Sequence, residues 1–258
     1  MARQLKAAFF DVDGTLLSFK THEVPASAIR ALEELRAADV RIFLCTGRSP
    51  SLLEDVPLEL FDACVTMSGA FCFAGDEAYL RRPIERQDME AVVAQVHEGL
   101  YHCLFMEPDC SYVSGYDQLV RRAFDDAALD VAVEDARVAL TRDVYQLNVF
   151  VPPERNQLVL DATSKLKLSR WSPNFADAMH VDAGKGAGVR ATLARWGMSP
   201  DEAVAFGDGG NDAEMFAAVG TSVCMGSAPA AVQALTTHVT EDADHDGIWN
   251  ACQRLGLL

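Results

Sequence analysis

The stretch AAFFDVDGT at residues 7–15 constrains the fold most, because an apolar run ends there in two aspartates one residue apart. Side chains at positions i and i+2 of a strand point the same way, so Asp11 and Asp13 would lie side by side where the strand ends. Two carboxylates that close repel each other, and one keeps its proton unless a positive charge is near. The pair therefore indicates a cation site, an acid/base pair, or both.

Apolar runs typical of buried strands recur along the chain and are separated by helical patterns. Five of them end in polar or glycine turns: LKAAFFD, VRIFLCTG, ACVTMSG, AVAFGDGG and TSVCMG. Helical patterns occupy 25–39, 186–197 and 211–220, and Gly197 and Gly220 close the last two where a C-terminal cap belongs. Strands that are apolar on both faces and alternate with helices predict an α/β fold, with a Rossmann-like parallel sheet covered on both sides.

The middle of the chain has a different pattern, in which strands rich in Tyr and Phe lie among helix-like stretches. It contains two predicted helices and two predicted strands, at 85–100, 154–165, 103–109 and 144–152. Residues 107–115 are typical of a hairpin of two short strands. We predict an inserted α+β domain over 81–179, between the two parts of a core formed by 1–80 and 180–258.

The charge balance argues against a nucleic-acid partner. The chain has 22 Lys and Arg against 38 Asp and Glu, a net charge of −16, and no basic stripe that would attract a phosphate backbone. An acidic protein that binds anions needs a local positive charge, such as that of a metal ion.

Compartment and assembly are constrained less tightly. No run approaches the roughly 18 apolar residues of a membrane helix, and the N-terminus lacks the long apolar segment of a signal peptide, so we expect a cytoplasmic protein without membrane contact. Seven scattered cysteines without a C-x-x-C pair are typical of free buried thiols. The sequence leaves a monomer and a homodimer equally open.

Further polar residues lie at the ends of other predicted core strands, the edge at which open α/β sheets place ligands. Thr46 and Gly47 follow the second strand, and Lys185 lies just ahead of a helix. Asp208 follows another strand, and Asp212 begins the helix after it. Carboxylate oxygens suit Mg²⁺, while hydroxyl and ammonium donors suit phosphate oxygens. These residues predict a site for a magnesium ion and a doubly negative phosphoryl group.

Four motifs in order over residues 11–212 resemble those of the haloacid dehalogenase (HAD) superfamily, and within it the Cof-type phosphatases: DVDGT, the Thr of LCTGR, the Lys of GKG, and GDGGND. With each fixed residue at roughly one in twenty, D-x-D-G-T alone would occur by chance in about two of a thousand chains of this length. The resemblance implies the HAD fold. It also implies a type-two cap inserted between Thr46 and Lys185, which closes over the site and carries most of the specificity.

The same resemblance implies a role for each motif residue. Asp11 would attack phosphorus to form an aspartyl-phosphate, and Asp13 would protonate the leaving oxygen and then activate water. The implied phosphate-binding residues are Thr46, Gly47, Lys185 and Asn211. The implied Mg²⁺ ligands are Asp11, the backbone carbonyl of Asp13, Asp208, and Asp212 directly or through water. The cation would also keep Asp11 ionised beside a second carboxylate.

One position departs from the family pattern. Cof-type relatives typically have Asn-Gly after the third core strand, and this chain has Ser68 before Gly69. A serine can hydrogen-bond a phosphate or a substrate hydroxyl, but its reach is shorter and it has no amide donor.

These observations predict a Mg²⁺-dependent phosphatase acting on a small phosphorylated metabolite. The alternatives are a phosphomutase or phosphotransferase of the same superfamily and a non-catalytic protein that keeps the fold for binding. A dehalogenase is disfavoured, since Asp13 would then have no leaving oxygen to protonate. Sugar phosphates, nucleotide or cofactor phosphates and polyol phosphates all remain open as substrates.

Two further groups of residues receive structural interpretations. Residues 241–250 place three carboxylates around His245, and we predict a solvated loop leading into the last helix in preference to a second metal site. Tyr145, Phe150 and Trp171 are predicted to pack mostly in the core of the inserted domain, with one or two of the insert's Met and aromatic side chains lining a pocket.

Overall fold

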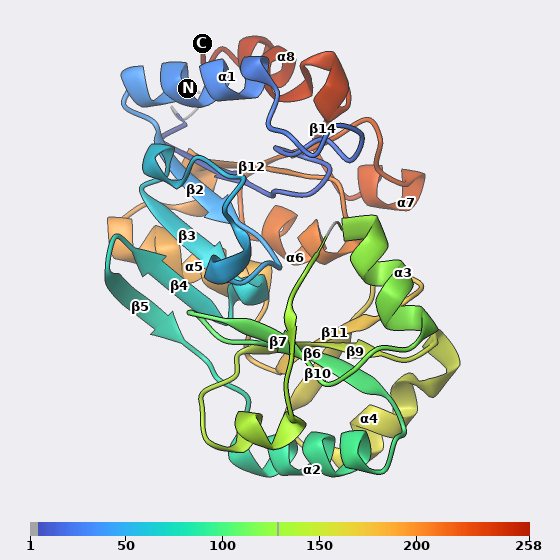
Figure 1. Cartoon of the computed structure of the whole chain (residues 1–258). Coiled ribbons are helices and arrows are strands. Elements are labelled where there is room, and N and C mark those ends of the chain that lie inside the picture. The colour runs from blue at the N-terminus through green and yellow to red at the C-terminus, as the bar shows by residue number, and fades with distance from the viewer. Residues whose placement is uncertain (1–4, 128) are drawn as a thin grey trace. The chain divides into compact units, whose positions relative to one another are not determined.

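The computed structural model describes residues 5–127 and 129–258, and internal contacts divide the chain into two compact units (Figure 1). The first unit comprises Met1–Gly47, Leu53–Leu80 and Gly184–Leu258, and the second comprises Arg48–Leu52 and Arg81–Ala183. Short 3₁₀ turns lie at Pro50–Leu52, Leu58–Leu60, Met67–Gly69, Ala136–Leu140, Pro153–Arg155, Pro200–Glu202, Gly210–Asp212 and Ala243–His245.

The first unit is built on an eight-stranded sheet with the order β14-β13-β12-β1-β2-β3-β4-β5. All neighbours from β14 to β3 run parallel, and β4 pairs antiparallel with β3. The strands are β1 (Ala7–Phe10), β2 (Arg41–Cys45), β3 (Ala63–Thr66), β4 (Phe71–Ala74), β5 (Glu77–Arg81), β12 (Ala203–Gly207), β13 (Thr221–Cys224) and β14 (His238–Val239). All five strands expected in this core are present, and the predicted α/β class is confirmed.

Helices cover both faces of this sheet, as the apolar strands require. One face packs against α1 (Ala26–Ala37) and α8 (Gly247–Arg254), and the other against α5 (Lys185–Trp196), α6 (Ala213–Phe216) and α7 (Ala230–Gln233) (Figure 1). The strands alternate between the two cores: Phe10 stacks on Phe206 at 4.7 Å on the α1 side, and Phe9 meets Phe43 at 4.9 Å on the other.

Glycine ends one predicted helix but not the other. Gly197 caps α5 in the left-handed region at φ +65°, as predicted. The prediction of a helix that continues to Gly220 is wrong, since α6 ends at Phe216. Gly220 serves a close approach instead: a Cβ there would lie 2.7 Å from Cα of Asp201.

The second unit is an α+β insert with a six-stranded sheet in the order β10-β11-β9-β6-β7-β8. Its strands are β6 (His102–Met106), β7 (Ser111–Val113), β8 (Ala132–Val133), β9 (Gln146–Phe150), β10 (Leu166–Ser169) and β11 (Ala176–His180). The predicted hairpin is the antiparallel pair β6–β7, and only β7 and β8 run parallel among the pairs of this sheet that the structure describes. Helices α2 (Arg86–His97) and α4 (Asn156–Ala162) bury apolar faces in its core, and α3 (Gln118–Ala127) completes the unit.

Side-chain burial agrees with the sequence in most places. Tyr145 and Phe150 are buried as predicted, whereas Trp171 is 47% exposed. Its indole N–H donates to the Asp177 carboxylate at 3.1 Å, so this ring serves a polar contact at the surface instead of filling the core. All seven cysteines are free thiols, and all but Cys110 are buried. No helix in the described ranges is long and apolar enough to cross a membrane.

Candidate active site

The carboxyl ends of parallel strands bring the predicted site residues to one edge of the first unit's sheet. Asp11 follows β1 and Asp208 follows β12, and the backbone N–H of Asp11 donates to Phe206 at 3.0 Å. Thr46 follows β2, and its N–H donates to Val65 on the next strand at 2.8 Å. Side chains that are far apart in sequence therefore meet here because their strands are neighbours.

Lys185 lies at the centre of the site. Its Nζ donates to Oδ1 of Asp11 and to Oδ1 of Asp212, each at 2.6 Å, and its side chain is completely buried. Burial alone would lower the pKa of this ammonium group, but the two carboxylates more than reverse that effect and raise it. A lysine that stays charged in the interior is held by its partners, because an unpaired buried charge is very costly.

Two glycines determine where Lys185 lies. Gly69, at φ +81° after β3, packs so closely on the start of α5 that a Cβ there would lie 2.0 Å from the carbonyl oxygen of Gly184. Only glycine permits both this backbone conformation and this approach. The first residue of α5, Lys185, is thereby held beside the end of β3.

Asp212 organises the loop that carries Asp208. Its Oδ2 accepts the backbone N–H groups of Asp208 at 3.0 Å and of Gly209 at 2.9 Å, while its Oδ1 accepts from Lys185. A Cβ at Gly207 would lie 2.6 Å from the Asp212 carboxylate, so the end of β12 must be glycine for this carboxylate to fold back. Asp212 thus links the loop to the lysine.

Three carboxylates crowd this site. One oxygen from each of Asp11, Asp208 and Asp212 lies within 4.8 Å of the others. Burial, and then the charge of Asp212, raises the pKa of Asp11 well above its usual range, and the same two causes raise the pKa of Asp208 to about 7. Lys185 offsets only part of this repulsion. A cluster of hard oxygen donors with excess negative charge fits a divalent cation such as Mg²⁺.

The turn after Asp11 is narrow. Gly14 has φ +77°, and a Cβ there would lie 2.4 Å from Oδ2 of Asp208. Thr15 is fully buried and its hydroxyl donates to Oδ1 of Asp208 at 3.4 Å. Asp13 is partly exposed, and its charge contributes to the raised pKa of Asp208 after burial and Asp212.

The other predicted phosphate-binding residues lie at the same edge. Thr46 is buried and Gly47 is partly buried. Asn211 lies in the turn after Asp208, with its side-chain oxygen against Gly209. In the described part of the chain Lys185 binds the two aspartates and not Asn211, so the role given to Asn211 remains a prediction.

Sequence reasoning missed two features. Thr15 belongs to the DVDGT motif, whose Gly-Thr was an available signal, yet it received no role. Ser68 was noticed, but not its conformation: its backbone lies in the left-handed region at φ 51°, and its N–H donates to the carbonyl of Thr46 at 3.0 Å. Its hydroxyl is buried and has no hydrogen-bond partner among the described residues.

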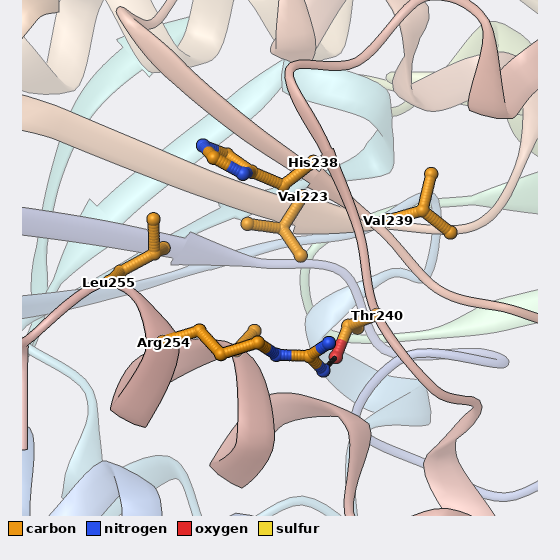
Figure 2. A pocket seen from close by; sticks show the side chains of 7 residues that line it. Val223, His238, Val239, Thr240, Arg254 and Leu255 are labelled. Atoms are coloured by element: carbon orange, nitrogen blue, oxygen red, sulfur yellow. Dashed lines mark hydrogen bonds between the residues drawn. The ribbon is translucent and has the colours of Figure 1, made fainter.

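A separate hollow of about 70 Å³ lies between β13, β14 and α8 (Figure 2). Its lining residues are Val223, His238, Val239, Thr240, Ala251, Arg254 and Leu255. Arg254 donates to the hydroxyl of Thr240 at 2.8 Å and also pairs with Glu241, as a structural guanidinium does. None of the carboxylates at the sheet edge lines this hollow.

Residues 241–246 lead into α8, which begins at Gly247, so only the first part of the segment 241–250 forms the predicted loop. His245 pairs with Asp242 at 2.6 Å. In the described ranges the only cluster of three or more acidic, His or Cys side chains suited to a metal is the one at Asp11, Asp208 and Asp212.

A parallel sheet that gathers aspartates and a buried lysine at its carboxyl edge has the architecture of an α/β protein with a ligand site at that edge. The chain matches the haloacid dehalogenase-like hydrolase family over residues 8–252, and it belongs to that family. It is 28% identical to the protein named "Putative phosphatase YkrA" of Bacillus subtilis, with 98% of each chain covered.

Solved structures agree with this family membership. The HAD subclass IIB sugar phosphatase BT4131 superposes with a TM-score of 0.91 at 33% identity, covering 98% of this chain and all of that one. The phosphatase BT1666 from Bacteroides thetaiotaomicron gives 0.90 at 28% identity, covering 99% of this chain and 96% of that one. The chain is therefore an enzyme of the phosphatase type, with the fold that the four motifs predict.

Proposed function

We propose that this enzyme is a Mg²⁺-dependent phosphomonoesterase that hydrolyses a small phosphorylated metabolite through an aspartyl-phosphate. The observation that carries the proposal is the buried Lys185, which bridges Asp11 and Asp212 beside Asp208. An ammonium group held among ionised oxygens orients a carboxylate and offers a donor to an incoming phosphoryl oxygen. A sugar phosphate is the first substrate class to test, because BT4131 is a sugar phosphatase.

Asp11 is the nucleophile in this proposal. One of its oxygens forms a bond to phosphorus while the ester P–O bond breaks, leaving an aspartyl-phosphate and an alcohol. Lys185 keeps the Asp11 side chain in one orientation and, with Thr46 and Gly47, holds the phosphoryl oxygens as charge builds on them. Asn211 and the unpartnered hydroxyl of Ser68 are further donors for the phosphoryl group or the substrate.

Asp13 moves the protons. It gives a proton to the leaving oxygen in the first half of the reaction and takes one from water in the second, so that hydroxide attacks phosphorus and Asp11 is released with inorganic phosphate. The side chain suits this role because it is partly exposed and lies two residues after the nucleophile.

Magnesium would be held by Asp11, the backbone carbonyl of Asp13, Asp208 and, directly or through water, Asp212. When bound, it supplies positive charge that neutralises the phosphoryl oxygens and keeps the nearby carboxylates ionised. Residues 81–179 would act as the cap that closes over the core of 1–80 and 180–258 and sets the choice of substrate.

The experiment measures phosphate release from a panel of sugar, nucleotide, cofactor and polyol phosphates, with Mg²⁺ and with EDTA. Asp11→Asn changes one atom and removes the nucleophile, so we expect kcat to fall by at least about a thousandfold while the fold is kept. Asp76→Asn makes the same change at an exposed aspartate and serves as the matched control.

Two outcomes would count against the proposal. Full activity of Asp11→Asn would rule out the aspartyl-phosphate, and full activity in EDTA would rule out the metal requirement. Consumption of a sugar phosphate without stoichiometric release of inorganic phosphate would point to the phosphomutase or phosphotransferase alternative.

A further inference from the structure

Phe19 is an exposed aromatic side chain beside the candidate catalytic carboxylates. It is 55% exposed, although burial of a phenylalanine side chain is worth about 1.5–3 kcal/mol. A Cβ built on Gly14 would lie 2.4 Å from Oδ2 of Asp208 and 2.5 Å from Cε2 of Phe19. Cε2 of Phe19 and Oδ2 of Asp208 therefore lie close to the same point. The distance between these two atoms is at most the sum of the two distances.

The residues on either side of Phe19 are tied to a single carboxylate. The buried hydroxyl of Ser18 donates to Oδ1 of Asp244 at 2.6 Å, and Nζ of Lys20 pairs with Oδ2 of Asp244 at 2.7 Å. We call the two contacts of Asp244 with Ser18 and Lys20 the clamp. Hydrogen bonding to Lys20, and then to Ser18, lowers the pKa of Asp244, so this carboxylate is charged at neutral pH. Asp244 lies in the loop before α8. It has no role in the proposed catalytic chemistry.

The turn is also fixed from within. The backbone N–H groups of Lys20 and Thr21 donate to the hydroxyl of Ser18 at 3.0 and 3.3 Å, and the N–H of Ser18 donates to Glu23 at 3.1 Å. Residues 18–23 thus form a turn closed by hydrogen bonds, and this turn carries the exposed ring of Phe19.

An apolar ring in this position cannot bind phosphoryl oxygens, which require donors or cations. It can pack against the apolar face of whatever is attached to the phosphate. We propose that Phe19 is a specificity-determining residue that supports the leaving group, and that Asp244 positions it. The preferred substrates are then phosphomonoesters whose leaving group presents an apolar ring face, such as the C–H face of a sugar ring.

This inference rests on the proposed phosphomonoesterase function, and the test separates the two. Steady-state kinetics are measured with a cyclic sugar phosphate, an aromatic phosphate, and the ringless glycerol phosphate. Phe19→Ala is expected to lower kcat/KM about tenfold for the ring substrates, mainly through KM, and to leave glycerol phosphate within about twofold. Phe19→Leu keeps an apolar side chain and is expected to keep most of the activity.

Leu235→Ala removes an equally exposed apolar side chain of the first unit and serves as the control. Asp244→Ala releases the clamp and is expected to give the same selective loss. Because both changes act through one ring, the double variant should be no worse than Phe19→Ala alone. A purely structural role of Asp244 would instead give additive losses on all substrates.

Equal effects of Phe19→Ala on ring and ringless substrates, or no effect on either, would overturn the inference while the phosphatase chemistry stands. A loss on the aromatic phosphate alone would also overturn the assignment to a sugar face. Failure of the unaltered enzyme to hydrolyse every ester would overturn the proposed function and this inference with it.

Discussion

Replacement of Asp208 by Asn is expected to stabilise the cation-free protein at alkaline pH. Burial and the charge of Asp212 raise the pKa of Asp208 from 3.8 to about 7 in the folded state. Between these two values the folded chain retains a proton that the unfolded chain has released, so the free energy of unfolding falls as pH rises. At about 1.4 kcal/mol per pKa unit, the loss reaches at most about 4 kcal/mol above pH 7.

Mg²⁺ is expected to remove most of this loss, because a bound cation favours ionised carboxylates. Urea unfolding followed by tryptophan fluorescence from pH 5 to pH 8, in EDTA and in Mg²⁺, measures the effect. Trp196 and Trp249 both lie in the first unit and report on its unfolding. In EDTA the wild type should lose more stability over this range than Asp208→Asn, in which only the raised pKa of Asp11 still opposes ionisation, so that the variant is the more stable protein at pH 8.

Asp76→Asn, at an exposed site, should follow the wild type at every pH. Parallel pH profiles of Asp208→Asn and wild type in EDTA would refute the reasoning, because the repulsion assigned to Asp208 would then be absent. An Asp208→Asn variant less stable than wild type at pH 8 would refute it as well.

Two further changes, one of them with a matched control, test the contacts that hold each unit. Gly69→Ala should lower the free energy of unfolding by about 3 kcal/mol. Residue 69 has φ +81°, and the new methyl group would lie 2.0 Å from the carbonyl oxygen of Gly184. Gly75→Ala has positive φ but nothing within 4 Å, so urea midpoints should show a loss of only about 1 kcal/mol. In the second unit, Asp88→Ala should cost about 1–2 kcal/mol by urea unfolding, because this buried carboxylate accepts two backbone N–H groups at 2.8 Å.

The core could be predicted from sequence because its signals are local. Strands apolar on both faces specify burial on both sides, and Gly197 marks a helix end through its own backbone preference. Asp11, Thr46 and Asp208 could be placed together because each follows a strand of one parallel sheet. The strands β4 and β5 were missed, although Gly75-Asp76 between apolar residues is a turn signal.

Other features depend on contacts that no local pattern contains. The burial of Lys185 is set by carboxylates 174 and 27 residues away, and an isolated lysine is usually exposed. The helix α3 was not predicted, although its sequence contains an apolar stripe. Val120, Ala123 and Phe124 form this buried stripe, and the charged residues between and around them make it hard to recognise. Trp171 lies at the surface, where its indole N–H donates to Asp177. The sequence around Trp171 does not predict this contact.

In the function that we propose, the electrostatics of the site require phosphate binding and cation binding to be linked. One buried ammonium faces three carboxylates, and it is already shared by Asp11 and Asp212. A doubly negative phosphoryl group would add to that excess in a chain of net charge −16. Protonation of Asp11 would relieve the repulsion but would disable the nucleophile that we propose, because a neutral carboxyl group attacks poorly. Additional positive charge beside Asp208 is the remaining way to accept the substrate and keep Asp11 reactive, so each ligand should strengthen the binding of the other.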